Sequence, residues 1–258
     1  MDIRMIVTDL DRTLLRTDKT VSDYSAAVLT AAKARGMRLA YATARPLRAT
    51  REYCERVPCD ALLCHNGAVI EHGETRIRLG IPTDIRDEIF EMLLREYPDA
   101  TLSMECDDSL WANFDFSAHW PGIVWTFTDF RDPAALPDLP ADKIIIGMRT
   151  KAEADALGKK LPEGYYAELS HDNIGMIMNA AATKWNAVQR LCALWDIAPA
   201  QVAAFGDDWN DCSMLKGCGV GVAVENAIPE ALEAADFICP ACDEDGVARW
   251  IADNLLNE

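Results

Sequence analysis

Basic residues are scarce in this chain of 258 residues, which has 25 lysines and arginines against 42 aspartates and glutamates. The formal net charge of −17 repels phosphate backbones and anionic lipid headgroups, so we expect neither nucleic acid nor a membrane as a partner. The sequence also lacks any apolar run approaching the roughly 18 to 20 residues that cross a bilayer. These absences argue against a nucleic-acid-binding or membrane-spanning protein.

Repeats, low-complexity tracts and a basic-then-apolar leader with a cleavage site are also absent. What is present is typical of a globular protein. Half of the residues are hydrophobic and 26% are charged, enough to build a core in one large domain or two modest ones. The nine cysteines, odd in number and scattered, indicate reduced thiols and hence a cytoplasmic protein. The oligomeric state stays open.

The first 81 residues alternate between apolar runs and helical patterns. A helix is predicted to begin near Ser22, a good N-cap residue, and to end at Gly36. A second helix is predicted from Pro46 to about Val57, because proline suits the first turn of a helix. Strands are predicted at 4–9, 37–42 and 61–64, followed by a hairpin at 69–71 and 75–79.

From about residue 82 the pattern changes to a mixture of helices, strands and aromatic clusters. Helices are predicted at 83–96 and 151–160, and strands at 101–106, 143–148, 165–169 and 174–178. After residue 179 the alternation of strand and helix resumes. This order predicts an α/β protein with a Rossmann-like, doubly wound parallel sheet core. The core would be formed by 1–81 and 180–258 and interrupted by an inserted α+β domain at 82–179.

Two acidic clusters each follow an apolar run that is typical of a buried parallel strand. Asp9 and Asp11 follow the first strand, and Asp207 and Asp211 follow a run far downstream. Open α/β sheets bind ligands beyond the carboxyl ends of their strands, so four carboxylates converge there if the two strands are neighbours. Such a cluster needs a cation, and hard oxygen ligands select Mg²⁺. A metal-assisted active site is the leading interpretation.

Taken singly, the polar residues near these strands have ordinary structural explanations. Acidic pairs cap helices and occupy turns, and Thr43 can cap the helix that follows it. Lys184 can be a solvated lysine, but a helix N-terminus disfavours a cation, so its position makes better sense beside a bound anion. Asp207 and Asp211 would lie within one turn of a helix that begins at Asp208.

The order of these residues along the chain is more specific than any one of them. Asp-Leu-Asp-x-Thr-Leu stands at 9–14, Thr43 ends the second strand, Lys184 opens a later helix, and Gly-Asp-x-x-Asn-Asp stands at 206–211. In that order they resemble the four motifs of the haloacid dehalogenase-like phosphatases, most closely the Cof-type branch. The resemblance covers the whole core, including the segments 66–68, 223–227 and 244–247. It makes 82–179 a cap domain, inserted between the second and third motifs, that sets substrate specificity.

The resemblance implies a phosphatase mechanism carried by four residues. Asp9 would attack phosphorus in line and form an aspartyl-phosphate intermediate. Asp11 would protonate the leaving oxygen and then deprotonate the hydrolytic water. Thr43 would hydrogen-bond the transferring phosphoryl group, and Lys184 would neutralise its charge. This division of labour suits phosphoryl transfer, in which catalysis is mostly positioning and charge stabilisation.

The same resemblance implies a Mg²⁺ site and a set of phosphate-binding residues. Mg²⁺ would be held by Asp9, Asp207 and the backbone carbonyl of Asp11, with Asp211 positioning a water on the ion. The cation and the lysine would let an anionic nucleophile approach an anionic phosphate. The residues that would contact the phosphoryl group or the substrate are Thr43, Ala44, Asn66, Lys184 and Asn210.

Three positions depart from the family pattern, which usually has glycine at each. Arg12 is expected to change the loop backbone and to point to solvent, with a substrate contact as the alternative. Ala44 is a small and tolerable change. Trp185 is large enough to fill part of the pocket or to pack on the core. None of the three removes a catalytic atom.

Several other features carry weaker expectations. Cys239 and Cys242 have the spacing of a redox pair or half a zinc site, but no partner pair accompanies them. His65 has no assigned role. Three arginines that share a helix face are expected to be solvent-exposed: Arg45, Arg48 and Arg51. Aromatic residues in the insert are expected in its core or stacked on a sugar face or planar ring: Trp111, Phe114, Phe116, Trp120, Trp125 and Phe127.

The sequence therefore predicts a Mg²⁺-dependent phosphatase of a small phosphorylated metabolite, such as a sugar phosphate or a phosphorylated cofactor. One alternative is a phosphomutase of the same fold, which returns the phosphoryl group to its product and must exclude water. Another is a non-catalytic metabolite-binding regulator, although a binding module need not keep a nucleophile. The substrate itself is not readable, because the cap loops that set it carry no code.

Overall fold

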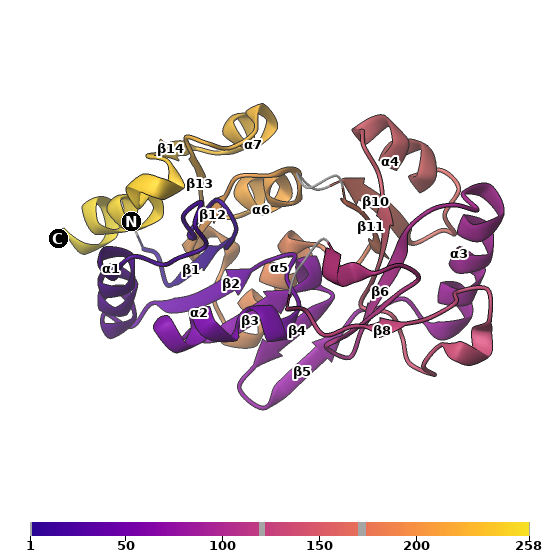
Figure 1. Ribbon diagram of the computed structural model, residues 1–258. Helices are drawn as coiled ribbons and strands as arrows, with labels where there is room; N and C mark the ends of the chain where they lie inside the picture. The colour runs from indigo at the N-terminus through magenta and orange to yellow at the C-terminus, as the bar shows by residue number, and fades with distance from the viewer. Residues whose placement is uncertain (1, 119–121, 170–173, 258) are drawn as a thin grey trace. The chain divides into compact units, whose positions relative to one another are not determined.

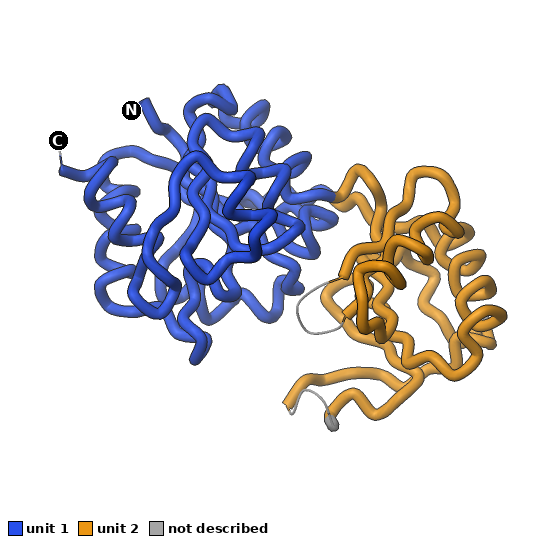
Figure 2. Tube along the Cα trace, turned by 90° about the horizontal axis from the view of Figure 1, so that it is seen from above, with its two compact units in different colours: residues 1–77, 183–258 blue, residues 78–182 orange. Residues whose placement is uncertain are grey.

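The computed structural model describes residues 2–118, 122–169 and 174–257. The chain folds into two compact units, Met1–Ile77 with Thr183–Glu258 (unit 1) and Arg78–Ala182 (unit 2) (Figure 2). The chain crosses between the units at 77/78 and 182/183, whereas the sequence prediction put these crossings at 81/82 and 179/180. Trp120, one of the aromatic residues of the insert, lies outside the described residues.

Unit 1 is built on an eight-stranded sheet with the strand order β14-β13-β12-β1-β2-β3-β4-β5 (Figure 1). Its strands are β1 (Met5–Thr8), β2 (Arg38–Ala42), β3 (Ala61–Cys64), β4 (Val69–His72), β5 (Thr75–Arg78), β12 (Val202–Gly206), β13 (Val220–Val224) and β14 (Phe237–Cys239). From β14 to β3 neighbouring strands pair in parallel, and β4 pairs antiparallel to β3. The order runs outward in opposite directions from β1 and β12, so the strand order reverses between these two strands.

Helices cover both faces of this sheet. In β1, Ile6 packs in one apolar cluster while Met5 and Val7 pack in the other, because successive strand residues point to opposite faces. The first cluster includes α1 (Asp23–Ala34), α2 (Arg51–Arg56) and α8 (Gly246–Ile251, continued by a π-helical turn, Ala252–Leu256), and the second includes α5 (Lys184–Trp195), α6 (Cys212–Gly217) and α7 (Pro229–Ala234). The predicted doubly wound α/β core is confirmed.

The helices after β1 and β2 show how local sequence sets helix ends. Ser22 caps α1 by accepting a hydrogen bond from a first-turn amide, and Gly36 follows the helix with a φ of 88°. The helix predicted to start at Pro46 is wrong as a single element. It is divided into a 3₁₀ turn, Leu47–Ala49, and α2. Thr50 separates the two, with its hydroxyl donating to a carbonyl of the turn.

Unit 2 has the α+β character that the sequence predicts for this part of the chain. Its sheet has the order β10-β11-β9-β6-β7-β8 and is antiparallel except between β7 and β8. Its strands are β6 (Leu102–Cys106), β7 (Ser109–Ala112), β8 (Thr126–Phe127), β9 (Lys143–Gly147), β10 (Tyr165–Leu169) and β11 (Ile174–Asn179), and its helices are α3 (Thr83–Glu96) and α4 (Lys151–Gly158). Phe116 is buried and Phe114 and Trp125 pack against its cluster, as a core role predicts, whereas Phe127 is 67% exposed.

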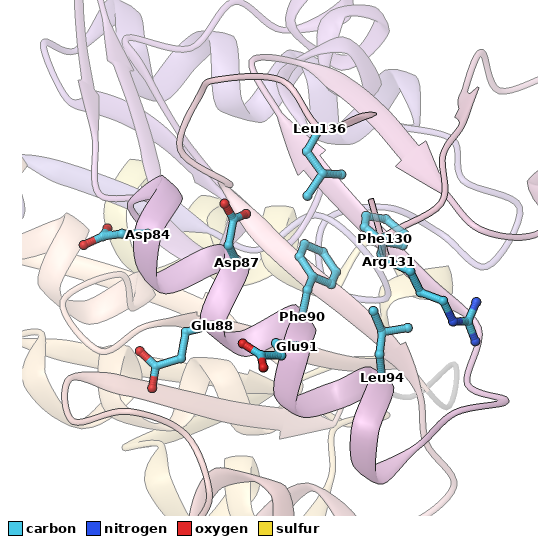
Figure 3. A pocket seen from close by; sticks show the side chains of 9 residues that line it. All are labelled: Asp84, Asp87, Glu88, Phe90, Glu91, Leu94, Phe130, Arg131 and Leu136. Carbon is cyan, nitrogen blue, oxygen red and sulfur yellow. The ribbon is translucent and has the colours of Figure 1, made fainter. Parts of the chain in front are cut away.

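A surface pocket of about 610 Å³ lies beside α3 in unit 2 (Figure 3). The rings of Phe90 and Phe130 stack in it with centroids 4.2 Å apart. Its charged residues are four carboxylates of α3 and a single guanidinium, that of Arg131, so its excess of negative charge does not suit a phosphate group. The pocket is lined by Asp84, Asp87, Glu88, Phe90, Glu91, Leu94, Phe130, Arg131 and Leu136.

Among the described residues, no helix combines the length and the apolar character needed to span a bilayer.

Candidate active site

The two acidic clusters of the sequence meet at the point where the strand order reverses. Asp9 follows β1 and Asp207 follows β12, and these strands are parallel neighbours, with Thr8 opposite Phe205 in the register. The backbone amide of Asp9 donates to the carbonyl of Phe205 at 2.9 Å, which extends the pairing into the loops. The carboxyl ends of two adjacent strands therefore present their carboxylates together, at the usual ligand-binding position of such a sheet.

Three buried carboxylates form a tight triad at this point. Oxygen atoms of Asp9, Asp207 and Asp211 all lie within 4.8 Å of one another. The hydroxyl of Thr13 donates to Asp207 Oδ1 at 2.9 Å, and Asp211 Oδ2 accepts from the amides of Asp207 and Asp208 at 3.0 and 3.1 Å. A 3₁₀ turn, Trp209–Asp211, capped by Asp208, precedes α6, and it brings Asp211 within one turn of Asp207, as a helix beginning at Asp208 would.

Lys184 supplies the positive charge of this cluster from the first turn of α5. Its Nζ donates to Asp9 Oδ1 and to Asp211 Oδ1, each at 2.7 Å, and the side chain is 1% exposed. The sequence predicts that this lysine lies beside an anion, and the carboxylates of Asp9 and Asp211 are such anions within the chain itself. The unfavourable position of a cation at a helix N-terminus is thereby offset.

The cluster carries more negative than positive charge. Burial raises the pKa of Asp207 to about 7, with Asp211 adding to the shift. Burial also raises the pKa of Asp9, against the opposing effect of Lys184. Burial alone would lower the pKa of Lys184, but Asp211 and Asp9 outweigh it, so the lysine stays protonated. Three carboxylates facing one ammonium need a further cation or a proton, and a donor set made only of oxygen fits a divalent metal ion.

Asp11 is not part of the triad, because its side chain is held by two basic residues. Arg45 donates two hydrogen bonds to the Asp11 carboxylate, from Nε to Oδ2 at 2.6 Å and from Nη2 to Oδ1 at 2.7 Å. Lys19 Nζ donates to Oδ1 at 2.8 Å. Burial would raise the pKa of Asp11, but these partners lower it to about 2, so the carboxylate is ionised here. Its expected metal ligand is a backbone carbonyl, which stays a prediction.

Arg45 is the main residue whose position the sequence prediction missed. It was expected to face solvent with Arg48 and Arg51, but its side chain is only 22% exposed, and its guanidinium carbon lies 5.2 Å from the ring centroid of Tyr53. Arg51 is exposed as expected and Arg48 is half-buried. A usable signal was present, because Arg45 lies only two residues beyond Thr43, in the loop at the carboxyl end of β2.

Thr43 and Ala44 lie in that same loop. Thr43 is 1% exposed, and its hydroxyl accepts from the amide of Arg45 at 3.1 Å. Its carbonyl accepts from the amide of Asn66 at 2.9 Å, which ties the loops after β2 and β3 together. Ala44 is half-buried beside it. The proposed phosphate contacts of both residues stay predictions.

Asn66 brings the loop after β3 to the loop after β12. Its Oδ1 accepts from Asn210 Nδ2 at 3.0 Å, so two of the predicted substrate-binding residues touch. His65, buried, and Asn66 both have positive φ, 49° and 55°, and Gly67 follows at 95°. A Cβ on Gly67 would lie 2.6 Å from the carbonyl oxygen of Thr183, so glycine is required where this loop meets the start of α5.

The loop after β1 is fastened by residues from the end of the chain. Asn226 Nδ2 donates to the carbonyl of Arg12 at 2.8 Å, and Arg16 donates to both oxygens of Asp245 at 3.2 and 2.7 Å. Arg12 has a φ of 61°, in the left-handed region that glycine favours, and is exposed as predicted. These fastening roles were missed, although both segments were part of the family resemblance.

The other departures and motifs have structural roles. Trp185 packs on the core. Its ring lies against Gly217, where a Cβ would be only 2.6 Å from it. Cys239 and Cys242 are both buried. Within the described ranges of the chain, the acidic triad is the one group of three or more metal-ligating side chains placed close enough to hold an ion.

The sequence matches a protein-family model described as haloacid dehalogenase-like hydrolase over residues 6–251. It is 28% identical to the HMP-PP phosphatase of Cronobacter sakazakii, over 94% of this chain and 92% of that protein. It is 24% identical to the 5-amino-6-(5-phospho-D-ribitylamino)uracil phosphatase YitU of Bacillus subtilis, over 96% of each chain.

The fold is also similar to solved structures. The subclass IIB sugar phosphatase BT4131 superposes with a TM-score of 0.84 at 20% identity, covering 97% of this chain and 98% of that one. This likeness extends across almost the full length of both chains, so both the sheet of unit 1 and the fold of unit 2 have counterparts among known proteins.

Proposed function

The chain belongs to the haloacid dehalogenase-like hydrolases and is a phosphatase, and we propose that it hydrolyses a small phosphorylated metabolite with the help of Mg²⁺. The observation that carries this proposal is the pairing of buried Asp9 with Lys184 Nζ at 2.7 Å, inside a triad of carboxylates. A nucleophilic carboxylate next to an ammonium group and a site for a divalent cation is what attack on a phosphate dianion requires.

The proposed chemistry assigns Asp9 as the nucleophile that forms an aspartyl-phosphate. Lys184 would offset the charge of the incoming phosphoryl group, and Thr43 would hydrogen-bond one of its oxygens. Asp9, Asp207 and Asp211, with the carbonyl of Asp11, would hold the metal ion. When bound, Mg²⁺ would neutralise phosphate charge and orient the group for in-line attack.

Asp11 has two tasks in this proposal, and its ion pairs bear on both. The ionised form held by Arg45 and Lys19 is the form that takes a proton from the hydrolytic water. Protonating the leaving oxygen requires the same carboxyl to hold a proton. Protonation of the leaving oxygen therefore requires the hydrogen bonds between Arg45 and Asp11 to break. This would happen when the anionic phosphate competes for the guanidinium.

The substrate class is proposed from the relatives and from charge. The two similar phosphatases are named for small phosphorylated compounds, a pyrophosphate and a ribitylaminouracil phosphate. We infer a sugar phosphate or a phosphorylated cofactor for this chain too, with unit 2 as the part that selects the leaving group. The net charge of −17 favours a small substrate over a polyanion.

Phosphate release from a generic aryl phosphate tests the proposal. Wild type would be compared with Asp9→Asn in the presence of Mg²⁺ or EDTA. Asp18→Asn is the matched control, because this exposed aspartate lies outside the cluster on the loop that follows. We expect Mg²⁺-dependent turnover by wild type and the control, and none by Asp9→Asn. Equal turnover by all three proteins would overturn the assignment of the nucleophile.

A mutase would behave differently in the same experiment. It would show little hydrolysis alone, and a bisphosphate activator would restore turnover of a sugar phosphate. A folded wild type that released no phosphate from aryl or metabolite phosphates, with or without the activator, would favour a binding protein.

A further inference from the structure

Two cysteines of unit 1 lie against each other. Cys54 is in α2, and Cys59 is in the loop that leads from α2 to β3. Their sulfur atoms are 3.7 Å apart, and both side chains are half-buried. Among the other seven cysteines, six are buried and Cys212, whose sulfur contacts a backbone carbonyl, is half-buried. The pair therefore combines closeness with access to solvent.

We propose that Cys54 and Cys59 are an oxidant-sensitive dithiol that closes reversibly to an intramolecular disulfide. A disulfide has a sulfur–sulfur distance of about 2.05 Å, so the two atoms need to approach by roughly 1.7 Å more. Rotation about the Cα–Cβ bond of a cysteine moves its sulfur over distances of this order. The segment between them is short, and Pro58 precedes Cys59, so the ends of the segment are already held near each other.

The chemistry balances with hydrogen peroxide as the oxidant. The sulfur of Cys54, as the thiolate, attacks one peroxide oxygen, which forms a sulfenic acid and releases hydroxide that becomes water. The thiol of Cys59 then attacks that sulfur, the new S–S bond forms, and the hydroxyl leaves as a second water. Two thiols lose two electrons and two protons in total, and one peroxide is reduced to two waters.

The local environment distinguishes the two cysteines. The contact with the Cys59 thiol lowers the pKa of Cys54, whereas the pKa of Cys59 is raised by the same contact and by burial. Cys54 is therefore the attacking thiol and Cys59 the resolving one. A metal site does not explain the pair, because no third ligating side chain stands close enough to it within the described residues.

Thiol counting and peptide mapping of the full chain test the proposal. Reduced wild type would be exposed to hydrogen peroxide, alkylated under denaturing conditions and digested with trypsin. We expect loss of two of the nine thiols and a disulfide between the peptides 52–56 and 57–76, both reversed by dithiothreitol. Cys212→Ser, which removes the other half-buried thiol, should form the same link.

Two variants separate this pair from other possibilities. Cys59→Ser should lose the link, which matters because the peptide 57–76 also contains Cys64. In this variant the oxidised Cys54 should be trapped as a sulfenic acid by a dimedone reagent. The proposal is overturned if wild type keeps all nine thiols, if Cys54 is over-oxidised while Cys59 stays reduced, or if the link persists in Cys59→Ser.

Discussion

Replacing Lys184 by methionine tests the charge balance of the site directly. The change keeps an unbranched side chain, one atom shorter, and removes the ammonium that bridges Asp9 and Asp211 at 2.7 Å. Removing one partner of a buried ion pair typically costs about 3–5 kcal/mol of folding free energy, since the remaining charge has no compensation. Three buried carboxylates without a cation put Lys184→Met at the upper part of that range at pH 8 without metal.

Two changes of solution should reduce this loss of folding free energy: a lower pH, and the addition of a divalent cation. Burial raises the pKa values of Asp9 and Asp207, to about 7 for Asp207, so these two carboxyls bind protons more readily in the folded state than in the unfolded state. The stability deficit of Lys184→Met should therefore shrink as the pH falls from 8 to 5, because protonation replaces the lost positive charge. A saturating divalent cation should shrink it as well, while phosphatase activity stays lost.

The measurement is unfolding in urea, with hydrogen exchange mass spectrometry as the readout, in EDTA and in Mg²⁺. Peptides of unit 2 serve as an internal reference, because the substitution lies in unit 1. Lys216→Met is the matched control. It removes the same charge from an exposed position in α6 and should change stability by no more than about 0.5 kcal/mol. If Lys184→Met and the control unfold at the same urea concentration in EDTA at pH 8, the described charge balance is wrong.

Three further changes have defined outcomes. Thr13→Val removes the hydrogen bond to Asp207 without changing side-chain size, and should weaken activation by Mg²⁺ about 10- to 100-fold in a titration of activity. Gly67→Ala should lower stability to urea by about 1–3 kcal/mol, because its Cβ meets the carbonyl of Thr183 and its φ is 95°; wild-type stability would contradict this. Burial raises the pKa of Asp142 from 3.8 to about 6, so folded unit 2 binds this proton more tightly than the unfolded chain. Its stability should fall as the pH rises from about 4 to 6, by up to about 3 kcal/mol, and Asp142→Asn should abolish that part of the pH profile in urea unfolding.

The backbone arrangement of the site was predictable because parallel strands have a readable pattern. The apolar runs before Asp9 and Asp207 were enough to predict two buried parallel strands that each end in carboxylates, and the structure makes these strands neighbours, which the sequence prediction had left as a condition. Helix positions were also close, with α3 found at the predicted residues 83–96. These features depend on local composition and on the period of apolar residues, both of which the sequence displays.

Side-chain pairings between loops were not predictable in the same way. Arg45 forms an ion pair with Asp11, and Thr13 donates a hydrogen bond to Asp207. In both pairs the separation along the chain follows no helical or strand period. The break in the helix near Thr50 and the fold-back of Asp211 depend on hydrogen bonds that compete with helix formation. Such contacts become visible only once the loops are placed in three dimensions.

The pairing of β1 with β12 also sets the order in which the molecule can be completed. During synthesis the N-terminal strand has only β2 as a neighbour until the last third of the chain has emerged. Unit 2, by contrast, is one continuous segment whose strands find all their partners within it. A nascent or truncated chain ending before residue 183 contains Asp9 but lacks Lys184, Asp207 and Asp211, whose side chains lie beside its carboxylate. Catalysis therefore requires synthesis at least as far as Asp211, and the slow step of folding is expected to be the late insertion of β12 beside a strand that was made first.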